Sequence, residues 1–279
     1  MELEEYRRVS REVWEAMAPG WGEWAAEMET ASAPVRAWLL RELDPRPGDT
    51  MLELSAGAGE TGFEIARLLG DDGRLISSDF ASEMVDVARR RGDEIGLRNV
   101  EYRVIDAERI GLPDNSVDGV VCRYGYMLVA DAARAFSETR RVVRPGGRIA
   151  LAVWSSAEDN PWASIAGRLL VERGQLPPPE PGAPGIFALA DEDRLRMLLG
   201  DAGFTGVRAE QVPVTFRFPS VDDYVAWATN TAGALAVVLR GFDENQRAAF
   251  AADLDELFAP FAAEGGYRFP GVAVCAAAS

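Results

Sequence analysis

Three glycines in one short segment have the spacing of a loop that lets a ligand approach the backbone. Gly57, Gly59 and Gly62 stand in LELSAGAGETG (residues 52–62) in the order G-x-G-x-x-G. Glycines at this spacing allow a sharp turn from a strand into a helix. A pyrophosphate or an amino-acid-bearing nucleoside can use such a turn, and a turn needed only for packing has the same spacing. The glycines alone therefore do not identify the ligand.

Three acidic residues end successive strand-like segments around this loop. Glu53 comes just before the loop, Asp79 ends the next segment in SSDF, and Asp106 ends the following one in VIDAE. An acid at the position of Glu53 suits a cationic ammonium or sulfonium ligand better than a pyrophosphate. In the second and third places, a carboxylate can accept ribose hydroxyls and an adenine amino group. A single acid at a strand end is usually a turn or cap residue, but three together predict a nucleoside site.

The composition excludes much of the catalytic repertoire. The chain has no histidine, and all 29 of its basic residues are arginine. An imidazole base, a histidine-ligated zinc, a Walker lysine and a Schiff base are therefore absent. Cys122 and Cys275 lie in apolar segments without metal-ligand spacing. We expect two buried, reduced thiols and no metal site.

Charge and hydropathy narrow the partners. The net charge of −16 disfavours a nucleic-acid partner, because it would repel the phosphate backbone. The first residues are charged, and no segment approaches the roughly 20 apolar residues of a membrane-spanning helix. We therefore expect a cytoplasmic protein without a membrane partner. The sequence leaves a homodimer open.

Alternating strand-like and helical segments predict an α/β fold with a doubly wound, mostly parallel, seven-stranded sheet. The expected strands are residues 50–54, 74–79, 100–106, 117–123, 147–154, 207–216 and 267–277. The expected helices are residues 61–69, 82–91, 131–143 and 191–202, with one or two at the N-terminus and two or three between 221 and 263. In such a sheet, a ligand binds beyond the carboxyl ends of the strands, where the glycine loop lies.

We divide the chain into three regions by this pattern. Residues 1–45 are expected to form an N-terminal helical lid, and residues 46–155 a cofactor-binding core. Residues 156–279 are expected to complete the sheet within the same domain. Helices at about 220–263 would form a substrate cap inserted before the last strand.

The motifs together resemble the class I S-adenosylmethionine-dependent methyltransferases, and among them the small-molecule group of the ubiquinone and menaquinone C-methyltransferases. The likeness is close from residue 51 to about 154 and rests on LELSAGAGETG, SSDFASEM, DAERIGLPDNSVDGVVC, YGYMLVAD and RRVVRPGGRIAL. It implies a Rossmann-like methyltransferase fold, S-adenosyl-L-methionine as cofactor and a small-molecule acceptor. The residues that it implies for cofactor binding are Glu53, Ser55, Ala56, Gly57, Gly59, Thr61, Asp79, Phe80, Met84, Asp106, Ala107, Cys122 and Arg123.

The resemblance also implies which part of the cofactor each group holds. The loop residues from Glu53 to Gly59 would hold the methionine part, and Asp79 the ribose. Phe80 and Met84 would cover the adenine faces, with Asp106 and Ala107 at the adenine edge. Cys122 and Arg123 would line the sulfonium region.

Two departures from the family pattern bear on the site. Ser55 stands where the family usually has its first glycine, and we expect it to keep a negative φ. Met127 and Leu128 stand where the quinone enzymes usually carry arginine and asparagine, which argues against a quinone-precursor acceptor.

Methyl transfer is an in-line displacement, so the protein must chiefly align the acceptor and exclude water. Without a histidine base, the best acceptor is a phenol or an enolisable carbon, because it loses its proton with the least help from the protein. The candidate catalytic residues are Tyr124, Arg123 and Tyr126, and Arg123 could instead form a salt bridge with Glu53 or Asp106. Aromatic residues outside the glycine loop could wall an acceptor pocket, although core packing is the commoner role for each. They are Trp14, Trp21, Trp24, Trp154, Tyr224 and Trp227.

Two alternative functions share parts of this pattern. An NAD(P)-dependent oxidoreductase also has a G-x-G-x-x-G loop and an acid about twenty residues later, here Asp79. Its usual catalytic arrangements need a lysine or a histidine, and the chain has neither. A non-catalytic protein that binds adenosylmethionine would have the same cofactor motifs.

Overall fold

A sheet in the order β3-β2-β1-β4-β5-β8-β6 runs through the molecule, with the short strand β7 paired to β8. The computed structural model describes residues 2–180 and 182–279. Five strands are parallel, and β8 pairs antiparallel with both β5 and β6. Their bounds are β1 Thr50–Leu54, β2 Arg74–Asp79, β3 Val100–Val104, β4 Val117–Arg123, β5 Val143–Trp154, β6 Arg208–Phe218, β7 Ala262–Ala263 and β8 Gly266–Ala278.

The sequence predicted seven strands, and the sheet of the described residues has eight. The added strand is β7, whose two residues are too few to show any hydrophobic alternation. β5 also begins earlier than expected, at Val143, directly after the preceding helix ends. Val143 pairs with Val117, and the register then shifts before Gly119 pairs with Arg148.

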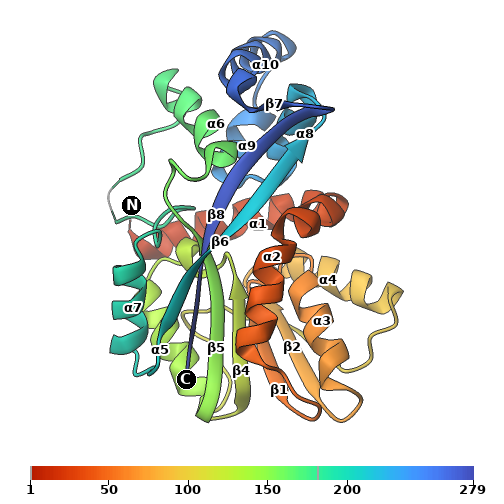
Figure 1. The fold of residues 1–279 in the computed structure, drawn as a ribbon, viewed down its shortest axis with the longest axis vertical. Helices are drawn as coiled ribbons and strands as arrows, with labels where there is room; N and C mark the ends of the chain where they lie inside the picture. The colour runs from red at the N-terminus through yellow and green to blue at the C-terminus, as the bar shows by residue number, and fades with distance from the viewer. Residues whose placement is uncertain (1, 181) are drawn as a thin grey trace.

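Helices cover both faces of the parallel strands (Figure 1). One side carries α2 (Ala25–Leu43), α3 (Glu60–Leu69) and α4 (Ser82–Glu94). The other side carries α5 (Ala132–Val142) and α7 (Glu192–Asp201). Because both faces are covered, the central strands are apolar and buried along nearly their whole length, as in β1 and β4.

The strand order places the glycine loop at the switch point of the sheet. β1 pairs with β2 on one side and β4 on the other, so the chain winds outward in opposite directions from this pair. The carboxyl ends of β1 and β4 therefore diverge toward different helices and leave a crevice between their following loops.

The two antiparallel strands extend beyond the rest of the sheet. Trp154, the last residue of β5, pairs with Ala273, while β8 continues to pair with β6 as far as Tyr267. Around this extension lie α6 (Pro161–Glu172), α8 (Val221–Thr231), α9 (Ala234–Arg240) and α10 (Glu244–Phe258) (Figure 1). The sequence pattern predicted two or three helices between residues 221 and 263, where α8, α9 and α10 lie, but it did not predict α6.

α1 (Leu3–Glu23) crosses between the sheet and this upper group of helices (Figure 1). The Tyr6 hydroxyl donates to the Leu128 carbonyl at 2.8 Å, and Trp21 Nε1 donates to the Thr231 carbonyl at 3.1 Å. These bonds join α1 to the loop after β4 and to the end of α8. Across residues 2–180 and 182–279, no helix combines the length and the apolar content that crossing a bilayer requires.

Candidate functional site

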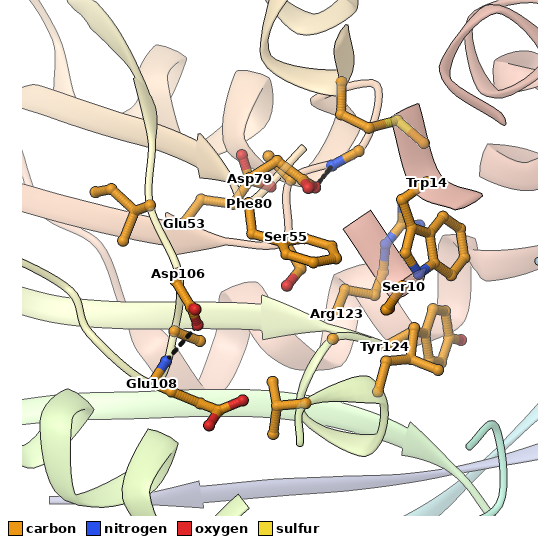
Figure 2. Close-up of a pocket in the computed structure, with 18 of the residues that line it drawn as sticks. Ser10, Trp14, Glu53, Ser55, Asp79, Phe80, Asp106, Glu108, Arg123 and Tyr124 are labelled. Atoms are coloured by element: carbon orange, nitrogen blue, oxygen red, sulfur yellow. Dashed lines mark hydrogen bonds between the residues drawn. The ribbon is translucent and has the colours of Figure 1, made fainter. Parts of the chain in front are cut away.

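A cavity lies under α1, at the carboxyl ends of β1, β2 and β4 and beside the loop that follows β3 (Figure 2). The loop after β1 contributes Ser55, Ala56 and Gly57, and α1 contributes Trp14 and Trp21. The parallel strands β1 to β4 therefore bring the residues at their ends or in the loops after them to one shared edge. This is where the sequence placed the ligand.

The turn after β1 is tighter at Ser55 than the sequence analysis expected. Ser55 has a φ of +54°, so the expectation of a negative φ is wrong. Gly57 and Gly59 also have positive φ, and the Ala56 N–H donates to the Ser78 carbonyl at 2.9 Å. The chain must leave β1 and enter α3 within a few residues, which forces a left-handed conformation. For a serine this conformation costs on the order of 1–2 kcal/mol.

Glu53 holds the loop against the sheet. Its Oε1 accepts the Gly62 N–H at 2.8 Å, and its Oε2 accepts the Ser77 hydroxyl at 3.0 Å. A Cβ at Gly62 would lie 2.1 Å from Oε2, so this approach requires the third glycine of the motif. Burial raises the pKa of Glu53 to about 8, so the group is largely uncharged at neutral pH. Glu53 lines the cavity, but its geometry is that of a positioning residue rather than a charge for a cationic ligand.

Asp79 presents a charged carboxylate at the end of β2. Its Oδ2 accepts the Gly57 N–H at 3.0 Å, and its Oδ1 accepts the Ala81 N–H at 3.1 Å. Burial raises its pKa to about 6, against the backbone bonds that favour the ionised form. Each carboxylate oxygen can accept a further hydrogen bond. Phe80 lines the cavity beside it (Figure 2), and Met84 also belongs to the cavity lining.

Asp106 occupies the corresponding place after β3. Its Oδ1 accepts the Glu108 N–H at 2.9 Å, and its carbonyl accepts the Arg109 N–H at 2.8 Å. Ala107 lines the cavity next to it. Two carboxylates thus face one cavity from neighbouring strand ends, as the sequence pattern predicted.

Glu108 and Arg7 also line the cavity, although no sequence pattern predicted either residue as part of the site. Glu108 is buried, pairs with Arg7 and accepts the Ala130 N–H at 2.8 Å. The signal that could have found Arg7 is helical spacing: Arg7, Ser10, Trp14 and Trp21 of α1 follow one another at intervals of three, four and seven residues. The other missed lining residues are Ser10, Met28, Ser32, Ile105, Gly125, Leu128, Val129 and Ala130.

Arg123 and Tyr124 enter the cavity from the end of β4. Arg123 lies 3.6 Å from Glu29 and 3.7 Å from Glu60, so the expected alternative of a salt bridge with Glu53 or Asp106 is wrong. Glu29 and Glu60 belong to helices α2 and α3, which pack over the strand end, whereas Glu53 is occupied by Gly62 and Ser77. Burial raises the pKa of Tyr124 above its ordinary value.

Other predicted site residues do not line the cavity. Tyr126 is buried against Phe136 and bonds to the Thr139 hydroxyl at 2.6 Å. Trp154, Tyr224 and Trp227 lie in an aromatic cluster with Trp162 and the phenylalanines of β6. Their inward orientation follows from the pairing of β5, β6 and β8, which one-dimensional patterns do not specify. The remaining predicted residues outside the cavity lining are Gly59, Thr61, Cys122 and Trp24.

Comparison with known proteins identifies the family. The sequence model described as the ubiE/COQ5 methyltransferase family matches residues 35–166. The ubiquinone/menaquinone biosynthesis C-methyltransferase UbiE of Escherichia coli O1:K1 / APEC is 30% identical over 185 residues, which cover 62% of this chain and 74% of that protein. The chain belongs to the ubiE/COQ5 methyltransferase family. It is an S-adenosylmethionine-dependent methyltransferase, which decides against the oxidoreductase alternative.

Solved structures support the fold of this family member. A SAM-dependent methyltransferase from Aquifex aeolicus has a TM-score of 0.51 and 26% identity, covering 66% of this chain and 87% of that one. The [4+2]-cyclase SpnF has a TM-score of 0.62 and 18% identity, with 97% of both chains covered, and shows a likeness of fold alone. The sheet and its flanking helices thus form a Rossmann-like methyltransferase fold.

The cavity of this methyltransferase fits S-adenosylmethionine. Asp79 keeps acceptor capacity beside an aromatic ring and a thioether, which suits a ribose next to a flat base. The glycine at position 57 leaves the backbone open, and the nearest atom to a Cβ there would be Trp21 Cε3 at 3.4 Å. The cavity therefore offers an acceptor for ribose hydroxyls, apolar side chains for a base and an open backbone turn.

Proposed function

We propose that this family member transfers the methyl group to an oxygen or carbon atom of a small, aromatic or apolar molecule. The observation that carries this proposal is the cavity itself, which has carboxylates at one end and aromatic side chains of α1 over it. Trp14 and Trp21 meet edge to face at 5.8 Å between ring centroids, which suits a cover that excludes water. The relative from Escherichia coli is named as an enzyme of ubiquinone and menaquinone biosynthesis. Met127 and Leu128 argue against a quinone precursor as the acceptor of this chain.

The geometry supports the cofactor contacts that the family resemblance implied. We assign the ribose hydroxyls to Asp79, the adenine edge to Asp106 and Ala107, and the adenine faces to Phe80 and Met84. The loop from Ser55 to Gly57 would hold the methionine part. S-adenosylmethionine supplies an activated methyl group when bound, so the protein need only align the acceptor with it.

We infer that no side chain of the cavity acts as a dedicated base. Burial keeps the Tyr124 hydroxyl protonated, and Tyr126 points away into the core. Asp79 and Asp106 accept backbone N–H groups and face the nucleoside end. The acceptor would therefore lose its proton by its own acidity, as a phenol or an enolisable carbon can.

The three predicted regions have matching roles in this proposal. Residues 1–45 would act as a lid through α1, residues 46–155 as the cofactor-binding core, and residues 156–279 as the completed sheet with a cap at 220–263. The cap helices surround an aromatic core, so they would shape the acceptor end indirectly. A homodimer, a cytoplasmic location and the lack of a nucleic-acid partner stay predictions.

Calorimetry with S-adenosylmethionine, S-adenosylhomocysteine and NAD tests the proposed site. The first two should bind and NAD should not. Asp79→Asn should weaken binding of adenosylhomocysteine about ten- to hundredfold, because it removes a charged acceptor of hydrogen bonds. An affinity within about twofold of the parent, in a folded variant, would remove Asp79 from the site.

A second measurement tests the reaction and the absence of a base. Across phenols of graded acidity, methylated product measured by mass spectrometry should show kcat/KM profiles that move with the acceptor pKa. A profile that stays in one place whatever the acceptor, with near-complete loss of activity in Tyr124→Phe, would reveal a protein base. Cofactor binding without product from any acceptor would indicate a non-catalytic protein.

A further inference from the structure

One wall of the cavity carries polar atoms that lack a hydrogen-bond partner among the described residues. They are Arg123 Nη1, the Tyr124 hydroxyl and the Ser32 hydroxyl. All three side chains line the cavity, and they are only 10%, 9% and 1% exposed, respectively. Buried polar groups in proteins are nearly always hydrogen-bonded. The Tyr124 and Ser32 hydroxyls lie near enough to interact with each other, and the oxygens of Glu29, also unpartnered, are acceptors close to Arg123. A ligand oxygen between the three side chains would supply the hydrogen bonds that this arrangement leaves unmade.

This wall is separate from the carboxylates assigned to the nucleoside. Ser32 belongs to α2, Arg123 ends β4 and Tyr124 follows it, whereas Asp106 follows β3. Figure 2 shows Arg123 and Tyr124 on the side of Trp14, away from Asp106 and Glu108. The three side chains therefore line a part of the cavity that the cofactor contacts leave open.

The guanidinium of Arg123 is not used up by its acidic neighbours. The separations of 3.6 Å from Glu29 and 3.7 Å from Glu60 are too long for hydrogen bonds. Glu60 also pairs with Arg91, so this acid is shared between two arginines. Arg123 Nη1 has no hydrogen-bond partner among the described residues.

The backbone holds Tyr124 in a conformation that bulky residues rarely adopt. Its φ is +65°, and its N–H donates to the Ala152 carbonyl at 2.7 Å. The ring stacks on Trp154 with centroids 4.1 Å apart and planes at 12°. Such strain persists where the surroundings enforce it, commonly at functional sites. Here it places a phenol hydroxyl on the cavity wall beside a cation.

We propose that Arg123, Tyr124 and Ser32 form an oxyanion subsite that binds the phenolate or enolate oxygen of the methyl acceptor. The subsite rests on the proposed transfer to an oxygen or carbon atom, since an ionised phenol or enol can react at either while its charge stays partly on oxygen. One guanidinium and two hydroxyls can all donate to such an oxygen. The subsite would thus favour the ionised acceptor. It would promote loss of the acceptor proton in a site that has no histidine to remove it.

A chromophoric phenol tests the subsite directly. The probe is 4-nitrophenol, whose phenolate absorbs visible light, added to the protein saturated with S-adenosylhomocysteine. A nearby positive charge lowers the pKa of an acid by about 1 to 3, so the bound probe should ionise about one pH unit or more below the free probe. Arg123→Met should return the probe pKa close to its free value.

Matched variants and a neutral ligand complete the experiment. Arg11→Met removes an exposed arginine that lies over the Phe80 ring, and it should leave the probe pKa where the parent has it. Tyr124→Phe and Ser32→Ala should each raise the pKa of the bound probe part of the way toward that of the free probe. These two variants still test the subsite if Arg123→Met does not fold. The neutral 4-nitroanisole should bind the parent and Arg123→Met within about twofold of each other.

Two results would overturn the subsite: no binding of 4-nitrophenol by the parent, or an unchanged probe pKa in all three subsite variants. Calorimetry with S-adenosylhomocysteine on the same samples keeps this separate from the proposed function. Its failure in the parent would count against the methyltransferase site. Normal binding with an unaffected probe would reject the oxyanion subsite alone.

Discussion

At the scale of single residues, burial gives two carboxyl groups of the site, Glu53 and Asp79, different protonation states. Glu53 and Asp79 are both nearly inaccessible to solvent, and both accept backbone N–H groups of the glycine loop or its surroundings. Burial raises the pKa of Glu53 to about 8 and that of Asp79 to about 6. At neutral pH the first is therefore mostly protonated and the second mostly charged. This difference separates the positioning residue from the residue that faces a polar ligand.

Glu53 should make the stability of the protein depend on pH. Its folded pKa of about 8 lies above its ordinary value of 4.5, so the folded chain binds more protons than the unfolded chain between these values. The free energy of unfolding should then be highest below pH 4.5 on this account and fall as pH rises through 8. Glu53→Gln should remove a decline on the order of a few kcal/mol, measured by urea denaturation at pH 5 and pH 9.

The exposed Glu94 provides the control for this comparison. Glu94→Gln should keep the decline of the parent, because a solvated carboxyl group has no burial cost to lose. Equal declines in the parent and in Glu53→Gln would show that Glu53 is not the group responsible.

At the scale of elements, α1 closes the site with few direct bonds. Near its start, Arg7 pairs with Glu108, and the Tyr6 hydroxyl bonds to the Leu128 carbonyl. Glu108 in turn accepts the Ala130 N–H, so one buried acid joins the helix to the loops after β3 and β4. The first half of α1 is therefore attached to the cavity edge through a small number of polar contacts.

Arg7→Met should loosen this attachment. The Arg7 side chain is 20% exposed and Glu108 only 4%, so the pair is largely shielded from water. Losing a hydrogen bond between charged groups should speed amide exchange over the first half of α1 about tenfold or more. Hydrogen–deuterium exchange followed by mass spectrometry measures this.

Arg8→Met is the matched control on the same helix. Arg8 is 56% exposed and pairs with Glu5 and Glu12 in solvent, where ion pairs contribute little. Its exchange should stay close to that of the parent. If both variants behave alike, the pair with Glu108 does not hold the helix down.

At the scale of the whole molecule, two long strands join the sheet to the upper helices. β8 pairs with β5 through Ala273 to Ala278 and with β6 along nearly its full length. The aromatic cluster of the upper helices includes Phe216, Phe218 and Phe269 of these same strands. The upper helices thus share strands, and not merely a surface, with the cofactor-binding core.

We therefore predict a single cooperative unfolding transition. S-adenosylhomocysteine at about 100 times its Kd should add about 2.7 kcal/mol of stability and raise Tm by roughly 5 °C, as one transition. Differential scanning calorimetry with and without the ligand measures this. Two transitions, of which only one responds to the ligand, would show instead that the upper helices unfold independently.

The sequence by itself was sufficient for the parallel core and its cofactor edge. The expected strands 50–54, 74–79 and 117–123 coincide with β1, β2 and β4, because strands buried on both faces are short apolar runs between polar turns. Strand order in a doubly wound sheet then places the residues after each strand at one edge. Asp79 and Asp106 were found in this way from local patterns alone.

Only the tertiary structure decided which other side chains face the cavity. Trp21 and Trp227 both lie in expected helical segments and were both candidates for the acceptor pocket. Trp21 lines the cavity, whereas Trp227 packs on Met28, 199 positions earlier in the chain. The positive φ of Ser55 and the acidic partners of Arg123 likewise depend on how helices pack over strand ends. Local hydrophobic patterns predict burial, but whether a buried face meets a cavity or another side chain depends on contacts between distant segments.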